Sequence, residues 1–204
     1  MSKQKVTIID TGVANLSSVL FAMNRLDADC IISARESDIR NADKLILPGV
    51  GSAVAAMKSI RERHLDDLIV NAHQPLLGIC LGMQMLAGFS EESMSQGTDA
   101  VKCLGIVDGG VRLMKVPGLV LPHMGWDQVE HDGSCPLFKD IPSGSYFYYV
   151  HSYALDVTGH TASTTTYGQT FSAVVNRDNF FGTQFHPEKS GPIGHKLLKN
   201  FLDL

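Results

Sequence analysis

Cys80 is the residue of this sequence whose surroundings most favour chemistry. It stands between two glycines in the run Gly78-Ile79-Cys80-Leu81-Gly82, where an apolar strand-like segment passes directly into a helical pattern. A nucleophile on a sharp strand-to-helix turn needs glycines on either side, because the backbone there is strained and closely packed. The N–H groups and positive dipole end of the following helix favour the thiolate, which is the reactive form of cysteine. Taken alone, the run also fits an ordinary buried thiol in a turn.

A histidine and a carboxylate lie two residues apart far downstream, in Gln184-Phe185-His186-Pro187-Glu188. Attack of a thiol on a carboxamide needs a base that takes the thiol proton and returns it to the leaving amine, and an acceptor that fixes the imidazole tautomer. His186 and Glu188 can fill these two roles. A lone His-Pro-Glu turn also fits surface structure, so the hypothesis depends on the cysteine and this pair occurring together.

A third glycine-containing turn, Pro48-Gly49-Val50-Gly51, follows an apolar segment. Such a turn can present backbone N–H groups, as an oxyanion hole requires. Its two glycines also permit a peptide flip that would aim one N–H toward or away from a developing oxyanion. By itself, the same run fits a rigid turn.

Alternating strand and helix patterns in the first half of the chain predict how these residues are positioned. Strands are expected at 6–9, 30–32, 44–47 and 75–79, and helices at about 15–26 with Asn15 as N-cap, at about 53–72, and from about Cys80 onward. Strands joined by helices pair in parallel, so we predict an open, mostly parallel α/β sheet with helices on both faces. Ligands of such sheets bind at the carboxyl ends of the strands.

Shorter strand patterns in the second half predict some antiparallel pairing. They lie at 146–153, 161–166, 171–176 and 180–185, and an amphipathic helix that carries Ile193, Leu197 and Phe201 follows near the end. No repeat, low-complexity run or linker divides the chain. We therefore expect a single domain over residues 1–204.

The overall composition excludes several classes of function. Hydrophobic residues make up 44% of the 204 residues in short dispersed runs, and the N-terminus has no secretory signal pattern, so we expect a cytoplasmic protein with no membrane partner. A net charge of −4 without a Lys/Arg cluster argues against nucleic acid. The four cysteines form no CxxC pair, the histidines do not fall at ligand spacings, and no GxGxxG follows a strand, so no metal or organic cofactor is expected.

The cysteine run, the His-x-Glu pair and the PGVG turn, in this order and at these separations, resemble class I (triad-type) glutamine amidotransferases over essentially the whole chain. Within that class, the runs LPGVGSAVAAM, PLLGICLGMQML, LPHMGW, YFYYVHSY and GTQFHPEKSG resemble the glutaminase subunits of imidazole glycerol phosphate synthase, in histidine biosynthesis. The resemblance implies hydrolysis of glutamine to glutamate and ammonia through a γ-glutamyl thioester on cysteine.

The resemblance also implies a role for each site residue. It makes Cys80 the nucleophile, with His186 and Glu188 completing the triad. The remaining positions are an oxyanion hole at Gly49, Val50 and Leu81, a glutamine pocket with Gly51, Gln84, His151, Ser152 and Tyr153, and a partner interface or gate with Tyr148 and Lys189.

The resemblance and the length of the chain together imply a separate acceptor of ammonia. Leu204 ends the sequence soon after HPEKSG, which leaves no room for an ammonia-using domain. In the resembled family the acceptor is a (β/α)8-barrel cyclase subunit that makes imidazole glycerol phosphate and aminoimidazole carboxamide ribonucleotide. This resemblance, together with the two glycines of PGVG, leads us to expect weak basal activity that the partner raises. Two alternatives are a glutaminase of another pathway, such as anthranilate, carbamoyl phosphate or GMP synthesis, and an inactive binding module. PHMGW and YFYYVHSY disfavour the first, and the complete triad disfavours the second.

Overall fold

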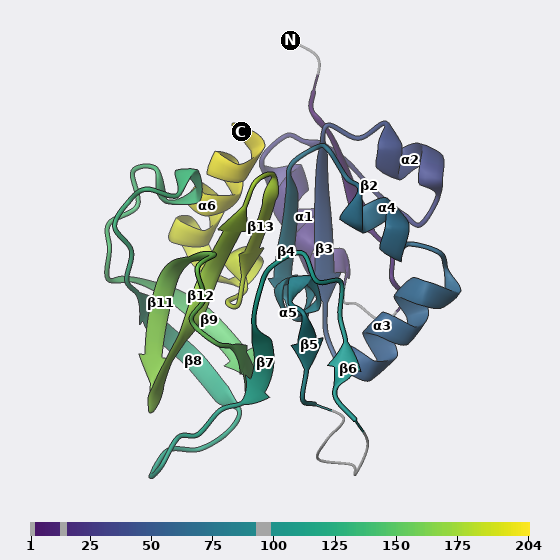
Figure 1. Ribbon diagram of the computed structural model, residues 1–204. Helices are drawn as coiled ribbons and strands as arrows, with labels where there is room; N and C mark the ends of the chain where they lie inside the picture. The colour runs from purple at the N-terminus through teal and green to yellow at the C-terminus, as the bar shows by residue number, and fades with distance from the viewer. Residues whose placement is uncertain (1–2, 13–15, 93–98) are drawn as a thin grey trace.

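A seven-stranded β-sheet forms the centre of the computed structural model, which describes residues 3–12, 16–92 and 99–204 (Figure 1). The strand order is β11-β12-β13-β4-β3-β1-β2. Five neighbouring strands pair in parallel: β13 (Phe180–Thr183), β4 (Leu76–Cys80), β3 (Lys44–Gly49), β1 (Lys5–Ile9) and β2 (Asp29–Ser33). The strands β12 (Gln169–Arg177) and β11 (Thr161–Tyr167) extend the sheet in antiparallel fashion. The predicted α/β sheet with some antiparallel strands is confirmed.

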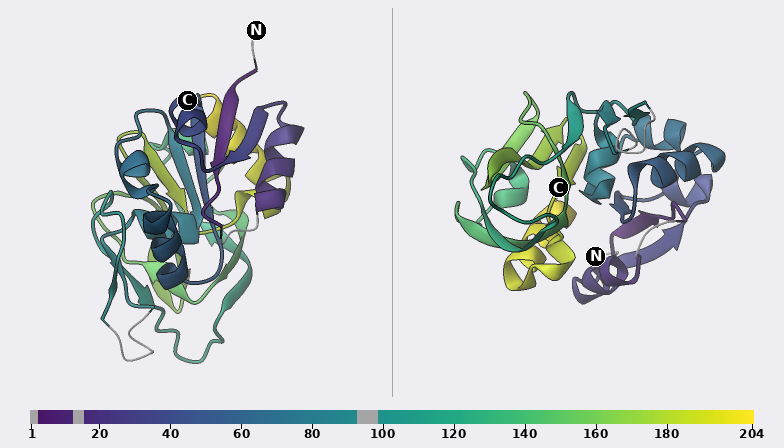
Figure 2. Two further views of the ribbon diagram at one scale, coloured as in Figure 1. Left: turned by 90° about the vertical axis from the view of Figure 1, so that its right-hand side faces the viewer. Right: turned by 90° about the horizontal axis from the view of Figure 1, so that it is seen from below.

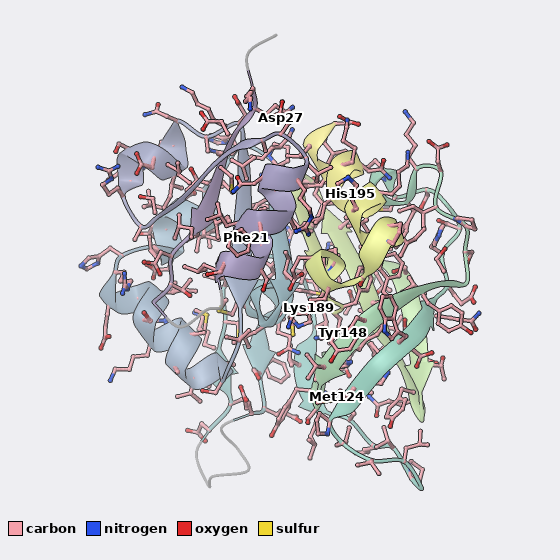
Figure 3. All side chains as sticks on the ribbon, turned by 180° about the vertical axis from the view of Figure 1, so that it is seen from behind. Phe21, Asp27, Met124, Tyr148, Lys189 and His195 are labelled. Carbon is pink, nitrogen blue, oxygen red and sulfur yellow. The ribbon has the colours of Figure 1, made fainter. Side chains whose placement is uncertain are left out.

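Helices cover both faces of this sheet, as predicted. On one face lie α1 (Leu16–Arg25) and α6 (Gly191–Leu202), which are in front in Figure 3. On the other face lie α2 (Glu36–Arg40), α3 (Ala53–Glu62), α4 (Asp66–Val70) and α5 (Leu81–Leu86). Each layer encloses its own apolar cluster, one around Met23 and Phe201 and the other around Met57 and Leu65. The two clusters hold the central strands from both sides.

Two smaller sheets are formed mostly by the second half of the chain, which lies beside the first half when the molecule is seen from below (Figure 2). A four-stranded sheet has the order β10 (Tyr153–Leu155), β7 (Gly110–Leu113), β5 (Phe89–Ser90) and β6 (Val101–Lys102). A two-stranded antiparallel ribbon consists of β8 (His123–Val129) and β9 (Ser145–His151). Among the described residues, the 3-10 helix η2 (Pro136–Phe138) lies between the two ribbon strands in the chain, and the 3-10 helix η3 (Pro187–Lys189) follows β13.

The single helix predicted at 53–72 is wrong, because the chain forms two helices there. His64 takes a left-handed conformation with φ of 55°, and its N–H donates to the carbonyl of Arg61. The N–H of Leu65 donates to the carbonyl of Ile60, which completes a Schellman motif that ends α3. Glycine or asparagine usually marks this position, so a histidine there gives no signal in the sequence.

The strand predicted at 146–153 is also wrong in its extent. It is divided at Ser152 into β9, which pairs with β8, and β10, which pairs with β7 in another sheet. The predicted first helix is present as α1, whereas its expected N-cap, Asn15, lies outside the described residues. The five-residue α2 was not predicted. In the described part of the chain no helix is long and apolar enough to cross a bilayer.

Candidate active site

The carboxyl ends of three neighbouring strands bring the predicted catalytic residues together. Gly49 ends β3 directly opposite Cys80, which ends β4. On the other side of β4, Thr183 of β13 pairs with Ile79, and His186 follows three residues later. Residues separated by more than a hundred positions in the sequence therefore meet at one edge of the sheet, where open α/β folds bind their ligands.

Cys80 occupies a strained turn between β4 and α5. Its φ of 54° and ψ of −110° are rare for a residue with a side chain. The turn is tight because backbone packs on backbone: a Cβ at Gly49 would come within 2.7 Å of the nitrogen of Gly82, and one at Gly78 within 2.8 Å of its carbonyl carbon. Only glycine fits at these positions, because the backbone segments approach too closely to leave room for a side chain. The strained cysteine is thereby held at the start of α5, whose first N–H groups have no partner within the helix.

We expect Gly82→Ala to destabilise the protein and to inactivate it. The added methyl would collide with the carbonyl oxygen of Leu47, a backbone atom that can move only if β3 moves. Overpacking of this kind costs about 1–3 kcal/mol or more. Thermal unfolding and Cys80 alkylation measure the effect, and Gly159→Ala is the control, because no atom lies within 4 Å of its Cβ position. Equal unfolding temperatures of the two variants would contradict the close-packed turn.

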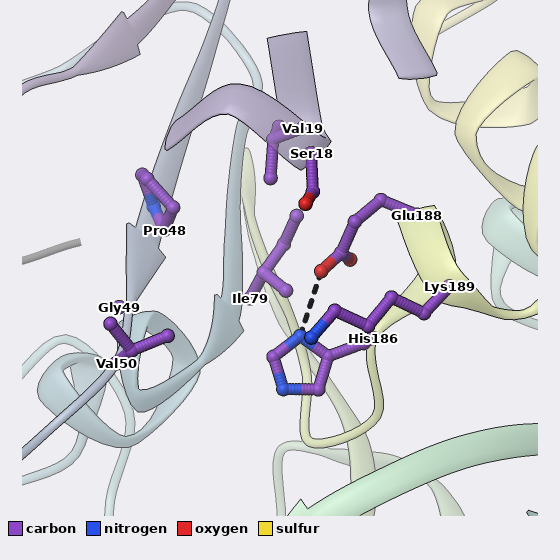
Figure 4. A pocket seen from close by; sticks show the side chains of 9 residues that line it. All are labelled: Ser18, Val19, Pro48, Gly49, Val50, Ile79, His186, Glu188 and Lys189. Atoms are coloured by element: carbon purple, nitrogen blue, oxygen red, sulfur yellow. Dashed lines mark hydrogen bonds and ion pairs between the residues drawn. The ribbon is translucent and has the colours of Figure 1, made fainter. Parts of the chain in front are cut away.

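His186 and Glu188 form a buried pair beside Cys80. The Nδ1 of His186 lies 2.8 Å from Oε1 of Glu188, and the two side chains are 5% and 4% exposed (Figure 4). Burial lowers the pKa of His186, but hydrogen bonds with Cys80 and Glu188 and the charges of both outweigh burial and raise the pKa to about 10. The imidazole is therefore protonated near neutral pH, and an imidazolium beside a sulfur stabilises negative charge on it.

A cavity of about 450 Å³ opens over Cys80. All five residues of the predicted glutamine pocket line it, together with the cysteine and histidine of the candidate triad. The lining residues predicted from the sequence are Val50, Gly51, Cys80, Leu81, Gln84, His151, Ser152, Tyr153, His186 and Lys189. Gly49 and Glu188 line a smaller adjoining cavity with Val50, His186 and Lys189 (Figure 4). Tyr148 lines neither of these two cavities.

Several residues of this site were missed by sequence reasoning. Glu92, Pro122 and Val150 line the large cavity, and Gln184 contacts Cys80 through its side chain. Pro122, Val150 and Gln184 each lie within two residues of a histidine in the PHMGW, YFYYVHSY or QFHPE run, but Glu92 gives no local signal. Glu92 reaches the cavity only through the packing of distant segments.

His151 is a neutral wall residue of the cavity. Burial is the main cause that lowers its pKa to about 3, and the charges of His123 and His186 lower it further. The hydrogen bond to the carbonyl of Tyr153 raises the pKa but does not outweigh these effects. Its Nδ1 donates to the carbonyl of Tyr153 at 2.9 Å, and its Nε2 lies 3.1 Å from Nδ1 of His123. The ring is committed to internal hydrogen bonds, so His186 remains the histidine available to Cys80.

The chain matches one protein-family model over nearly its whole length. The model of the family described as "Glutamine amidotransferase class-I" matches residues 7–204. The chain belongs to the class I glutamine amidotransferase family. Among the described residues of this family member, no group of three or more His, Cys, Asp or Glu side chains could hold a metal ion.

Curated relatives match this class I amidotransferase from end to end. It is 51% identical over 204 residues to "Imidazole glycerol phosphate synthase subunit HisH" of Vibrio parahaemolyticus, with 100% of each chain covered. It is 52% identical over 200 residues to the HisH subunit of Pectobacterium atrosepticum, covering 98% of this chain and 100% of the relative.

Solved structures share the fold at low sequence identity. A putative GMP synthase protein from Thermoplasma acidophilum superposes with a TM-score of 0.75 at 19% identity, covering 100% of this chain and 94% of the other. A protein described only as a glutamine amidotransferase gives 0.73 at 17% identity, with 97% of each chain covered. Together these confirm the predicted class I amidotransferase-like fold.

Proposed function

We propose that this chain acts as one glutamine amidotransferase domain that hydrolyses glutamine and delivers the ammonia to a separate cyclase subunit in histidine biosynthesis. The observation that carries the proposal is the buried His186–Glu188 pair beside Cys80, where Cys80 and His186 line a cavity large enough for an amino acid. The similarity to HisH subunits over the whole chain supports the pathway. Four free cysteines suit a reducing compartment, so we propose a cytoplasmic location.

The proposed chemistry uses one proton carrier for two steps. The Sγ of Cys80 attacks the side-chain carbonyl carbon of glutamine, and the oxygen becomes an oxyanion that N–H groups at Gly49, Val50 and Leu81 stabilise. His186 gives its proton to the leaving nitrogen, so that ammonia departs and a thioester remains. His186 then takes a proton from water, the hydroxyl adds to the thioester carbon, and Cys80 leaves as glutamate forms. Glu188 holds Nδ1 of His186 throughout.

Glu92 and Gln84 suit recognition of the amino-acid end of glutamine. The Glu92 carboxylate accepts the N–H of Ala53 and lines the cavity, where its charge can pair with an α-ammonium group. Burial raises the pKa of Glu92, against the lowering effect of the Ala53 hydrogen bond, and a bound cation would offset this burial. The Nε2 of Gln84 is used by Tyr153 and Gln184, so only its carbonyl oxygen remains for a ligand.

The outward face of the β8–β9 ribbon is our proposed docking surface for the cyclase, a (β/α)8-barrel by resemblance. Met124 and Trp126 of β8 are 62% and 54% exposed, and Tyr146 of β9 is 54% exposed. Trp126 pairs with Tyr148 across the ribbon, with ring centroids 6.1 Å apart. Trp, Tyr and Met are enriched in protein interfaces. Figure 3 places Met124, Tyr148 and Lys189 along one side of the molecule.

Tyr148 connects this surface to the triad through its backbone. Its carbonyl accepts the N–H of His186 at 2.9 Å, and its N–H donates to Oγ of Ser190 at 3.0 Å. Oγ of Ser190 in turn donates to the carbonyl of His186 at 2.7 Å. A partner that shifts β9 would therefore move the turn that holds the catalytic base, which suits the expected stimulation by the partner.

Assays with the purified chain and the candidate cyclase test the proposal. We expect glutamate release to be weak for the free chain, higher for the complex, and highest when the ribonucleotide substrate of the cyclase is also present. Release at the fully stimulated rate by the free chain would refute gating by the partner. Stimulation by an anthranilate or GMP synthase partner instead of the cyclase would move the enzyme to another pathway.

We expect Trp126→Ala to weaken the complex about 10–100-fold, because truncation of a central aromatic residue at an interface costs about 2 kcal/mol or more. Titration of the cyclase with the variant measures the dissociation constant. Val70→Ala is the control, since Val70 is 42% exposed on α4, which lies on the opposite side of the molecule from β8 (Figure 1). Unchanged affinity of Trp126→Ala, or an equal loss in the control, would contradict the proposed surface.

A further inference from the structure

Gln184 is a buried residue of the site with no role in the chemistry described so far. It follows β13, two residues before His186, and its side chain is completely buried. Its Nε2 lies 3.7 Å from Sγ of Cys80, within hydrogen-bond reach of a sulfur acceptor. Its Oε1 lies 2.9 Å from Nε2 of Gln84. A fully buried amide is therefore placed directly against the proposed nucleophile.

The orientation of this amide is fixed by the backbone carbonyl of Tyr153, which acts on it through the side chain of Gln84. The carbonyl oxygen of Tyr153 can only accept, and Gln84 contacts it at 2.8 Å, so the group of Gln84 that faces it must be the NH2. The second N–H of that group then points at Gln184, which must present its oxygen. The NH2 of Gln184 consequently faces the sulfur. Turning either amide around would bring two acceptors, or two donors, face to face.

A donor aimed at sulfur is useful in both halves of the proposed reaction. Negative charge resides on Sγ before attack and again when Cys80 leaves the thioester. His186 approaches the same sulfur as the proton carrier, whereas an amide N–H donates without giving up its proton. Hydrogen bonds to a charged group are stronger than those between neutral groups, and inside a protein the loss of one is not made good by water.

We propose that Gln184 is a positioning residue that donates an N–H to Cys80, holds the sulfur in place, and stabilises its negative charge. The orienting chain runs from the carbonyl of Tyr153 through Gln84 to Gln184. The carbonyl of Tyr153 also accepts a hydrogen bond from His151. The hydrogen bonds therefore run without a break from the wall of the glutamine pocket to the sulfur of Cys80. This inference rests on the proposed function in that it takes Cys80 to be the nucleophile.

Two variants separate the donor from the bulk of the side chain. Gln184→Met keeps the volume and removes the amide. Gln184→Glu keeps an oxygen for Gln84 and replaces the donor to sulfur by a second acceptor. Thr183→Val is the matched control: Thr183 is the preceding residue, is equally buried, and its hydroxyl donates to the carbonyl of Phe185 at 3.0 Å.

The decisive measurement is the pH dependence of Cys80 alkylation by iodoacetamide in the full chain, with the modified peptide identified by mass spectrometry. We expect the pH of half-maximal alkylation to rise by about one unit in Gln184→Met, as the loss of one charge-assisted hydrogen bond implies, and to rise at least as far in Gln184→Glu. Thr183→Val should keep the wild-type profile. This readout does not require glutaminase activity, so its outcome is independent of whether the proposed function holds.

Steady-state kinetics of the complex with the cyclase give the second readout. We expect the glutaminase kcat of Gln184→Met to fall about 10–100-fold while KM changes less than about threefold, because the donor acts on charge at sulfur rather than on glutamine. A wild-type alkylation profile in either folded variant would overturn the proposal. So would a loss confined to KM, or an equal shift in the Thr183→Val control.

Discussion

Cys80→Ser will abolish glutamine-dependent synthesis by the complex and leave ammonia-dependent synthesis intact. The serine hydroxyl is isosteric enough to keep the strained turn, but it is a much weaker nucleophile than a thiolate at neutral pH. Loss of the nucleophile from a triad costs on the order of 10⁴-fold or more in turnover. Ammonia supplied from solution bypasses this step, because only the cyclase uses it.

Labelling by a glutamine-analogue electrophile checks the assignment by a second route. Burial raises the pKa of Cys30 to about 12 and that of Cys103 to about 11, and it also raises the pKa of Cys135. These thiols are therefore protonated near neutral pH and unreactive. We expect serine variants at the three positions to be labelled like the wild type and Cys80→Ser not at all. Glutamine-dependent turnover that survives in Cys80→Ser would refute the nucleophile.

The order of strands and helices in the parallel half of the fold was predictable from local sequence. The runs at 6–9, 44–47 and 75–79 are continuously apolar or nearly so because those strands are buried on both faces. The run at 30–32 differs, since β2 lies at the sheet edge with Ile31 and Ile32 exposed. The end of α3 was not predictable, because it depends on a left-handed conformation of His64, which glycine or asparagine usually adopts, and on the burial of the following Leu65.

The candidate triad was predictable because its members sit in short motifs with unusual residue types. The division of 146–153 into two strands was not, since an alternating pattern does not say which sheet each half joins. Glu92 reaches the cavity from a segment with no motif, and Gln184 acquires meaning only when Gln84 and Cys80 lie against it. The positions of Glu92 and Gln184 in the site depend on contacts between segments that are distant in the sequence.

His186→Ala will reduce glutaminase turnover about 10³–10⁴-fold, and Glu188→Gln will reduce it less, by about 10–100-fold. The base transfers a proton in both halves of the reaction, whereas the carboxylate only orients the base and stabilises its charge. Glutamine at position 188 can still accept from Nδ1 of His186 through its carbonyl oxygen, so part of the orientation survives. Single-turnover and steady-state assays of the complex measure both losses.

Glu188→Gln also has a predictable effect on the pH dependence of activity and stability. Burial lowers the pKa of His186, but the hydrogen bonds and charges of Cys80 and Glu188 outweigh burial and raise this pKa to about 10. A raised folded-state pKa contributes stability that is fully present below the unfolded value of about 6.5 and is lost as pH rises toward 10. Glu188→Gln removes one raising charge, so the alkaline limb of activity and the alkaline loss of stability both move to lower pH.

A surface carboxylate provides the control for this shift. Glu130 follows β8, outside the strands β3, β4 and β13 that meet at the candidate triad, and it accepts a hydrogen bond from Ser143 at 2.8 Å, so Glu130→Gln should change neither turnover nor the alkaline limb. Chemical denaturation at about pH 7 and about pH 9.5 measures stability separately from catalysis. If Glu188→Gln retained the wild-type alkaline limb, Glu188 would not act on His186. If His186→Ala and Glu188→Gln were both near wild type in turnover, the three residues would not form a catalytic triad.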